Sequence, residues 1–323
     1  MRQLAFLINP VSGGGAGLQV YERLEEILES FGVKRDAWVA ELAEAGRVGD
    51  QAEALLRGAR KLIAVGGDGT IGEVLDRARR TRSGATIGLI PLGTGNDLGR
   101  ALGVYRVYDS KGLVACLKRI LRAPALPFDL WDAGQGAATV ASYLSAGLDA
   151  AVLRDFDRAR KRGVVRGGAL GNKLYYLKAL AARAAWRFPP GTKARLETAG
   201  GAIELDLSGK CAVLAANIDS YAAGAHPVPG NLFDDGQLEV AVFDTLWRYA
   251  VVTALSRTLP ATARWARLRR YRASRIELSL PPGVPVQIDG EDFTGKLPSE
   301  PLSVAFAARV RLLDLRRSFY ALF

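Results

Sequence analysis

Short apolar runs alternate with longer amphipathic segments over the first part of the chain. Leu4–Asn9, Leu62–Val65 and Thr86–Pro91 are almost wholly apolar, which is typical of parallel strands buried on both faces. Another strand is expected at 36–39, and apolar residues recur at helical spacing at 20–31, at 50–57 and onwards from residues 70, 96 and 110. This alternation predicts a doubly wound α/β domain over residues 1–126.

From about Pro127 the apolar residues follow the spacing of short, closely placed strands. The expected strands are 128–131, 138–144, 193–198, 202–207, 211–218, 238–243, 275–280, 284–288 and 303–312. Two helical segments, Leu170–Trp186 and Leu246–Leu259, interrupt this pattern. Residues 127–305 are therefore predicted to form a second domain, an antiparallel β-sandwich.

A glycine-rich segment follows each of the three buried strands. The segments are Asn9-Pro10-Val11-Ser12-Gly13, Gly66-Gly67-Asp68-Gly69-Thr70 and Pro91-Leu92-Gly93-Thr94-Gly95-Asn96-Asp97. Because parallel strands end at one edge of a sheet, the three loops should gather there. Glycines let backbone N–H groups approach an anion, and the start of a helix attracts negative charge, so the pattern predicts a phosphate site.

Two of these loops also carry a carboxylate, Asp68 and Asp97. A triphosphate repels a neighbouring carboxylate unless that group holds Mg²⁺ or accepts a proton from an attacking hydroxyl. The carboxylates therefore indicate catalysis as well as binding.

Other nucleotide motifs fit the chain less well. Gly67–Gly72 matches the G-x-G-x-x-G pattern, but the acidic ribose partner expected about 20 residues later is missing, since Ile87, Gly88 and Leu89 occupy that stretch. The chain also has no G-x-x-x-x-G-K-[ST], H-R-D or D-F-G motif. A simple hydride-transfer site, a P-loop and a protein-kinase site are therefore not expected.

The order N-P-x-S-G, then G-G-D-G-T, then P-L-G-T-G-N-D-L-x-R resembles the diacylglycerol kinase catalytic-domain family, which includes bacterial soluble lipid kinases and the sphingosine and ceramide kinases. Later segments, Leu232–Leu238 and Val286–Glu291, are similar to the D-D-G-x-L and D-G-E motifs of that family. The resemblance implies an ATP- and Mg²⁺-dependent kinase that phosphorylates a lipid hydroxyl, with diacylglycerol as the favoured substrate. It also implies that the tail from about residue 306 to 323 returns to the first domain.

The resemblance assigns particular positions to the nucleotide. They are Asn9, Pro10, Ser12, Gly13, Gly66, Gly67, Gly69, Thr70, Glu73, Gly93, Thr94, Asn96 and Asp97, with Asp68 in a catalytic role. Two positions depart from the family pattern. Gly72 stands where an asparagine is usual, and the threonine that ends the second strand has no clear counterpart, Ala40 being the nearest residue.

The resemblance places the general base at Glu291, supported by Asp289, on the opposite side of a cleft from the nucleotide loops. Two residues apart on an extended strand, the two acids would point to the same side, and each would raise the pKa of the other. It further implies a structural Mg²⁺ held by Asp235 and the backbone carbonyls of Leu232 and Gln237; a simple Asp-Gly turn is the alternative.

The net charge of +11 is unevenly distributed. One basic block lies at Arg154–Arg166, and another, at Arg264–Arg275, includes Trp265 and Tyr271. Arginines among aromatic residues suit an anionic membrane surface, where a lipid kinase has to find its substrate. We therefore expect peripheral membrane contact and no nucleic-acid partner, and whether the chain forms a homodimer is left open.

No apolar stretch reaches the roughly 18 residues that span a bilayer, and the first residues lead directly into a strand, so a cytoplasmic protein is expected. Cys116 and Cys211 are predicted to be buried apolar residues, and His226, the only histidine, to be structural. The alternatives to a diacylglycerol kinase are a kinase of sphingoid or other lipids, an NAD kinase, and a non-catalytic membrane- or nucleic-acid-binding protein.

Overall fold

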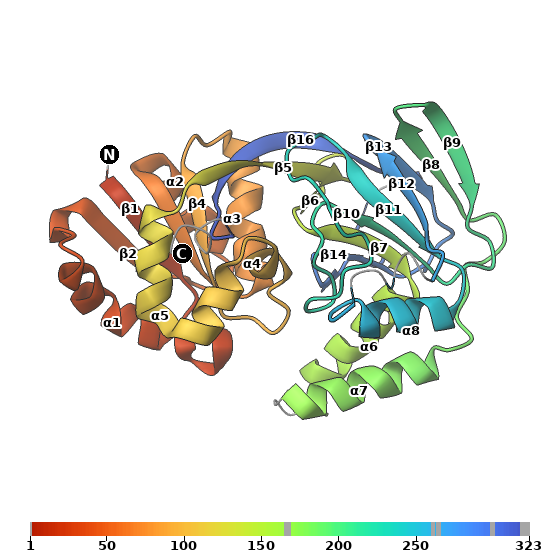
Figure 1. Ribbon diagram of the computed structural model, residues 1–323, viewed down its shortest axis with the longest axis horizontal. Helices are drawn as coiled ribbons and strands as arrows, with labels where there is room; N and C mark the ends of the chain where they lie inside the picture. Colours follow the sequence, from red (N-terminus) through yellow and green to blue (C-terminus); the bar gives the residue numbers. More distant parts are fainter. Residues whose placement is uncertain (1, 165–168, 260–261, 263–265, 298–300, 317–323) are drawn as a thin grey trace. The chain divides into compact units, whose positions relative to one another are not determined.

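The computed structural model describes residues 2–164, 169–259, 262, 266–297 and 301–316 (Figure 1). The chain forms two compact units, Met1–Leu130 with Ala307–Phe323, and Trp131–Phe306. The domain boundaries predicted from the sequence were between residues 126 and 127 and at about residue 306. The chain passes from one unit to the other within two strands, β5 (Ala125–Ala133) and β16 (Leu302–Leu313).

The first unit is built on a parallel sheet of strands in the order β2-β1-β3-β4. These strands are β1 (Arg2–Ile8), β2 (Trp38–Leu42), β3 (Ala59–Gly66) and β4 (Thr86–Pro91). The end of β16 runs parallel beside β4, with Arg311 opposite Thr86. The central strands are buried over their whole apolar runs, which explains why they lack the alternation of a half-exposed strand.

The helices of this unit connect its strands (Figure 1). They are α1 (Ala16–Ser30), α2 (Val48–Gly58), α3 (Asp68–Thr81), α4 (Asp97–Ala101) and α5 (Val104–Arg122), with short 3₁₀ turns at Ser12–Gly14 and Arg35–Ala37. The chain leaves β1 toward β2 at one side and leaves β3 toward β4 at the other. The carboxyl ends of β1 and β3 therefore flank the point at which the strand order reverses, the usual ligand position in such folds.

The second unit contains two antiparallel sheets. One has the order β12-β11-β10-β7-β14-β15, and the other contains β9, β8, β13 and β16 in sequence, with β5 and β6 beside β16. Their bounds are β6 (Ala138–Val140), β7 (Tyr143–Gly147), β8 (Lys193–Thr198), β9 (Gly201–Asp206), β10 (Ala212–Ala216), β11 (Leu238–Phe243), β12 (Arg269–Ala273), β13 (Arg275–Ser279), β14 (Val286–Ile288) and β15 (Glu291–Asp292).

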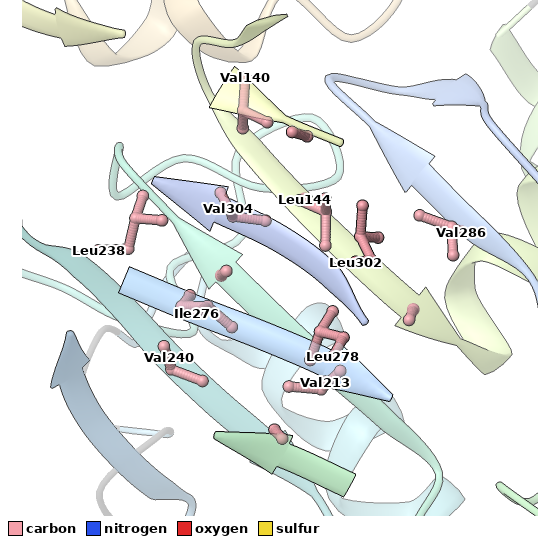
Figure 2. Close-up of a cluster of buried hydrophobic side chains, with 14 of the residues drawn as sticks. Val140, Leu144, Val213, Leu238, Val240, Ile276, Leu278, Val286, Leu302 and Val304 are labelled. Carbon is pink, nitrogen blue, oxygen red and sulfur yellow. The ribbon is translucent and has the colours of Figure 1, made fainter. Parts of the chain in front are cut away.

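An apolar core lies between the two sheets (Figure 2). Val213 and Ala215 of β10 and Val240 of β11 meet Ile276 and Leu278 of β13 in this core. The intervening residues of β10 and β11 face the other way, as the two-residue period of a strand requires. The expected α/β domain followed by an antiparallel β-sandwich is thus confirmed.

Two helices cover the outer face of the six-stranded sheet, and a third packs against one of them (Figure 1). They are α6 (Leu148–Lys161), α7 (Ala169–Ala182) and α8 (Leu246–Leu255). Val152 of α6, Ala179 of α7 and Val252 of α8 join Leu214 and Phe243 of the sheet in a second apolar cluster. The structure thus buries both faces of this sheet, one against strands and one against helices. Within the described residues, no helix has the length and apolar character needed to cross a bilayer.

The second apolar cluster surrounds a buried carboxyl group, that of Asp149 at the start of α6. Ser145, Tyr221 and Gln287 donate hydrogen bonds to one of its oxygens, and the hydroxyl of Tyr249 follows that of Tyr221 at 3.4 Å. Burial raises the pKa of Asp149 above its usual range, and the hydrogen bonds oppose that shift. The donors thus hold a carboxyl group inside a layer that is otherwise apolar.

Three details of the second unit differ from the sequence-based expectation. The run 138–144 is two strands, because the chain bends at Ala141 and Ser142. Helix α6 overlaps the first basic block in sequence, and β12 lies within the second block. The many charged residues there hid the apolar pattern of both elements. Arg166, Arg264 and Trp265 of these blocks lie outside the described residues.

Candidate functional site

The three glycine-rich loops meet at the carboxyl ends of β1, β3 and β4. The parallel ladder continues into each loop by one bond, from the Asn9 N–H to the Val65 carbonyl (2.9 Å) and from the Leu92 N–H to the Gly66 carbonyl (2.7 Å). The loops therefore start level with one another. Their predicted convergence follows directly from the sheet register.

The first loop turns tightly through three glycines. Gly13, Gly14 and Gly15 all have positive φ angles (64°, 68° and 99°), and α1 begins directly after them. Asn9 shapes the start of the loop, since its side-chain oxygen accepts the N–H of Val11 at 3.2 Å. A turn of glycines with no Cβ atoms lets an anion approach the backbone N–H groups just before α1.

The second loop opens α3, whose N-cap residue is Gly67. No side chain caps this helix, so the first N–H groups of α3 have no partner within the helix. Asn9 donates from its side-chain amide to the hydroxyl of Thr70 at 2.9 Å, which ties the first loop to the second. The positive end of α3 is thus fixed beside the glycine turn.

The third loop is joined to the second by Asp68. One oxygen of the Asp68 carboxylate accepts the backbone N–H of Asn96 at 2.9 Å. Asn96 itself is left-handed (φ 54°) and donates its side-chain amide to the Gly93 carbonyl at 2.6 Å. Its side-chain oxygen is buried and has no hydrogen-bond donor among the described residues. A buried acceptor without a donor is uncommon, and it marks this point of the loop contact as strained or functional.

Glycine is required where the second and third loops touch. A Cβ atom on Gly93 would lie 2.9 Å from the Cα of Gly67 and 2.9 Å from the side-chain oxygen of Asn96. Both distances are shorter than Cβ atoms tolerate, so a side chain here would push the loops apart. The close approach leaves the N–H groups of the two loops in one small region.

The environment of Asp68 disfavours its negative charge. Burial raises the pKa of Asp68 to about 6; the Asn96 N–H opposes this shift, and the neighbouring Asp97 adds to it. A divalent cation would stabilise the charged form that the protein alone disfavours. The glycine cradle, the uncapped α3 and this carboxylate together fit a phosphate group accompanied by Mg²⁺.

The remaining predicted nucleotide residues lie at different depths. Asp97 is buried, Ser12 is half-buried and Thr94 is exposed on the third loop. Glu73 is exposed on α3, and the contacts that join the loops run through Asn9, Asp68, Thr70 and Asn96 instead. Gly72 faces open space, with no atom within 4 Å of the position of a Cβ.

Arg100 belongs to this site although the sequence analysis gave it no role. Its guanidinium donates to the Gly95 carbonyl at 3.1 Å and stacks on Tyr105, 3.7 Å from the ring centre. Arg100 therefore links the third loop to Tyr105 of α5. The arginine that closes the P-L-G-T-G-N-D-L-x-R motif was the available signal.

In the second unit, the D-G-E segment forms a hairpin. Ile288 pairs with Glu291 across a turn of two residues, Asp289 and Gly290, both with positive φ (50° and 86°). This is the turn that an Asp-Gly pair favours between two strands. The expectation that the two acids lie on one extended strand is therefore wrong, because the chain reverses between them.

Asp289 uses its carboxylate to hold backbone. It accepts the N–H groups of Ala141, Ser142 and Tyr143, each at 2.8 Å, and its own N–H donates to the Tyr143 carbonyl. These bonds impose the bend between β6 and β7. Glu291 lies exposed on the other side of the turn. Asp289 thus positions the hairpin that carries Glu291.

The predicted metal ligands, the histidine and the two cysteines lie away from the glycine-rich loops in sequence, and their contacts are as follows. Asp235 accepts the Gln237 N–H at 3.0 Å and forms an ion pair with Arg272, while Leu232 is exposed. The Nδ1 atom of His226 contacts the Asp219 carbonyl, and the backbone N–H of His226 donates to the Ser256 hydroxyl. Cys116 and Cys211 are buried and free, as expected.

Comparison with known proteins decides the family. Models of the diacylglycerol kinase catalytic domain and of the diacylglycerol kinase accessory domain match residues 3–132 and 139–292. The chain belongs to the diacylglycerol kinase family. The two matches follow the two units of the structure closely.

Individual relatives are distant in sequence. The chain is 28% identical to the eye-specific diacylglycerol kinase of Drosophila melanogaster over 88% of its length, but spans only 21% of that protein. It is 27% identical to the "Probable lipid kinase YegS-like" of Pseudomonas fluorescens, covering 75% of this chain and 74% of the relative. A solved diacylglycerol kinase structure from Bacillus anthracis has the same fold, with a TM-score of 0.67, 19% identity and 96% of both chains covered.

Substitution of Gly93 by alanine tests the cradle. Gly93→Ala should weaken ATP binding by roughly tenfold or more, about 1.4 kcal/mol, because the new methyl group separates the loops that are predicted to hold the phosphates. The measurement is ATP titration of both proteins by calorimetry. Gly84→Ala is the control, since a Cβ at Gly84 meets no atom within 4 Å. Unchanged affinity in Gly93→Ala would contradict the assignment.

The raised pKa of Asp68 predicts a pH-dependent stability. A carboxyl group whose folded pKa of about 6 exceeds its unfolded value stabilises the fold fully at low pH and loses that contribution as pH rises through about 6. Asp68→Asn lacks this loss. Without nucleotide, its free energy of unfolding relative to that of wild type should therefore rise by about 2 kcal/mol between pH 4.5 and pH 7.5. Urea unfolding at both pH values measures the difference, and parallel curves would count against the raised pKa.

Proposed function

We propose that the protein is an ATP-dependent lipid kinase that transfers the γ-phosphate of ATP to a lipid hydroxyl. The convergence of three strand-end loops on one anion cradle carries this proposal, and the matches to both diacylglycerol kinase domains support it. Diacylglycerol, which would give phosphatidic acid, is the favoured acceptor because relatives named as diacylglycerol kinases align with 88% and 90% of this chain.

The residues of the cradle have distinct tasks in this proposal. Backbone N–H groups after Gly13, Gly67 and Gly93 bind the phosphates, and Thr94 and Asn96 add side-chain contacts. Asp68 keeps the second and third loops together and presents a carboxylate to a metal ion. Mg²⁺, when bound with ATP, supplies charge neutralisation at the phosphates.

Glu291 is proposed as the general base that accepts the proton of the lipid hydroxyl. It is an exposed carboxylate on a hairpin whose turn is anchored by three hydrogen bonds to Asp289, so its backbone is held firmly. A base on a rigid element keeps its position better than one on a loop. Asp289 acts through this anchoring and needs no contact with substrate.

Substitution of Glu291 by glutamine tests the assignment. Glu291→Gln should abolish transfer of labelled phosphate from γ-labelled ATP to diacylglycerol in mixed micelles, while ATP affinity stays within about twofold of wild type. Glu204→Gln, an exposed substitution on β9, is the control and should transfer normally. Normal turnover in Glu291→Gln would remove the base assignment, whatever the lipid.

A panel of acceptors separates the alternatives. Sphingoid bases, ceramide, monoacylglycerol and other lipid alcohols present a hydroxyl on an apolar body, as diacylglycerol does. Phosphorylation of NAD without any lipid product would indicate an NAD kinase. Binding of membranes or nucleic acid without transfer to any acceptor would indicate a non-catalytic protein.

We also propose that the α6–α7 region of the second unit contacts an anionic membrane. Leu174 and Leu177 lie one turn apart on α7 and are 59% and 61% exposed, with the exposed Lys178 beside them. The opposite side of α7 joins the second apolar cluster through Ala179, and α7 packs against α6. Arg158, Arg160, Lys161 and Arg162 end α6, so apolar and cationic residues adjoin in one region.

Vesicle binding tests this contact. Wild-type protein should sediment with vesicles of phosphatidylcholine and phosphatidylglycerol. The double variant Leu174→Ser, Leu177→Ser should bind at least about tenfold more weakly, since it loses two exposed apolar side chains that would be buried in the bilayer. Leu18→Ser, an exposed leucine on α1, is the control. Equal binding of the double variant and wild type would rule out this region as the contact.

A further inference from the structure

The turn that leads into β11 contains the site at which a structural Mg²⁺ was predicted. Residues 232–237 form this turn, and Asp235 is its predicted metal ligand, together with the backbone carbonyls of Leu232 and Gln237. The side chain of Asp235 is only 19% exposed, so its charge needs a partner.

A cationic side chain already meets this need. Strand β12 pairs with β11 so that Arg272 lies directly opposite Glu239. The Nε of Arg272 is 2.9 Å from an oxygen of Glu239, and its Nη2 contacts an oxygen of Asp235. One guanidinium thus bridges two carboxylates, one in the strand and one in the preceding turn. The sheet register fixes this position.

The arrangement does not fit a divalent ion. One oxygen of Asp235 accepts the N–H of Gln237, and the other is in contact with Arg272. Mg²⁺ requires near-octahedral oxygen ligands, and a +2 ion at Asp235 would lie next to a fixed positive charge. The guanidinium and the ion would compete for the same carboxylate.

We propose that Arg272 takes the place of the structural cation in this chain. Its planar guanidinium, with donors spread over a fork, reaches two carboxylates at once and fixes the turn at 232–237 to β12. The turn therefore keeps its conformation without a divalent metal. This inference concerns a part of the second unit distinct from the nucleotide cradle and does not depend on the reaction.

The test compares thermal unfolding of the full-length protein in EDTA, in millimolar MgCl₂ and in millimolar CaCl₂, always without nucleotide. The wild-type midpoint should be the same in all three. Arg272→Gln should unfold several degrees lower in EDTA, because two half-buried carboxylates lose their counter-charge, and either cation should restore most of the loss. Arg195→Gln, an exposed substitution on β8, is the control and should show no response to metal.

A second variant covers the case in which Arg272→Gln does not fold. Arg272→Lys keeps the charge but cannot bridge both acids, so its midpoint should fall less and should not respond to metal. A wild-type midpoint that rises with Mg²⁺ would overturn the proposal, because the ion would then displace Arg272. A drop in Arg272→Gln that neither cation restores, or a metal response in Arg272→Lys, would overturn it as well.

Discussion

The contact between the second and third glycine loops is the constraint on which the candidate site depends. The backbones at Gly67 and Gly93 are so close that a Cβ at Gly93 would not fit between them. Asp68 then spans the same gap with a single hydrogen bond to the Asn96 N–H. Because these links are short, the backbones of the two loops lie side by side at the start of α3, an arrangement that suits a compact anion such as a phosphate.

A comparable constraint organises the second unit. The carboxylate of Asp289 holds three backbone N–H groups, and this bond set bends the chain between β6 and β7 while it fixes the turn before Glu291. The outcome is one side chain that sets the position of two elements 146 to 148 residues apart in sequence. The D-G-E motif is therefore explained first by folding: aspartate for the anchor, glycine for the positive φ, and glutamate left exposed at the hairpin.

The sequence predicted best those features that depend on local pattern. Apolar runs gave β1, β3 and β4, and the glycines after them gave the loops, because parallel strands must end at one edge. Helix α6 and strand β12 were missed because their charged residues hid the apolar positions, such as Val152, that pack against the sheet. The hairpin at Asp289 was read as an extended strand, since a spacing of two residues does not reveal a turn between them. Which partner a carboxylate finds, such as Arg272 for Asp235, depends on strand register and cannot be read from composition.

The two acidic positions assigned to metal differ in the way their charge is balanced, and the difference indicates where a divalent ion belongs. Asp235 contacts a guanidinium that the sheet register holds in place. Asp68 has two backbone N–H donors, that of Asn96 and its own, and the favourable charge of Arg100. These do not offset burial and the charge of Asp97, so the pKa of Asp68 is raised to about 6. A cation gains most where the protein has left negative charge poorly stabilised, and that place is the glycine cradle. The chain thus supplies its own counter-charge at the turn and leaves the cradle to be completed by ligand.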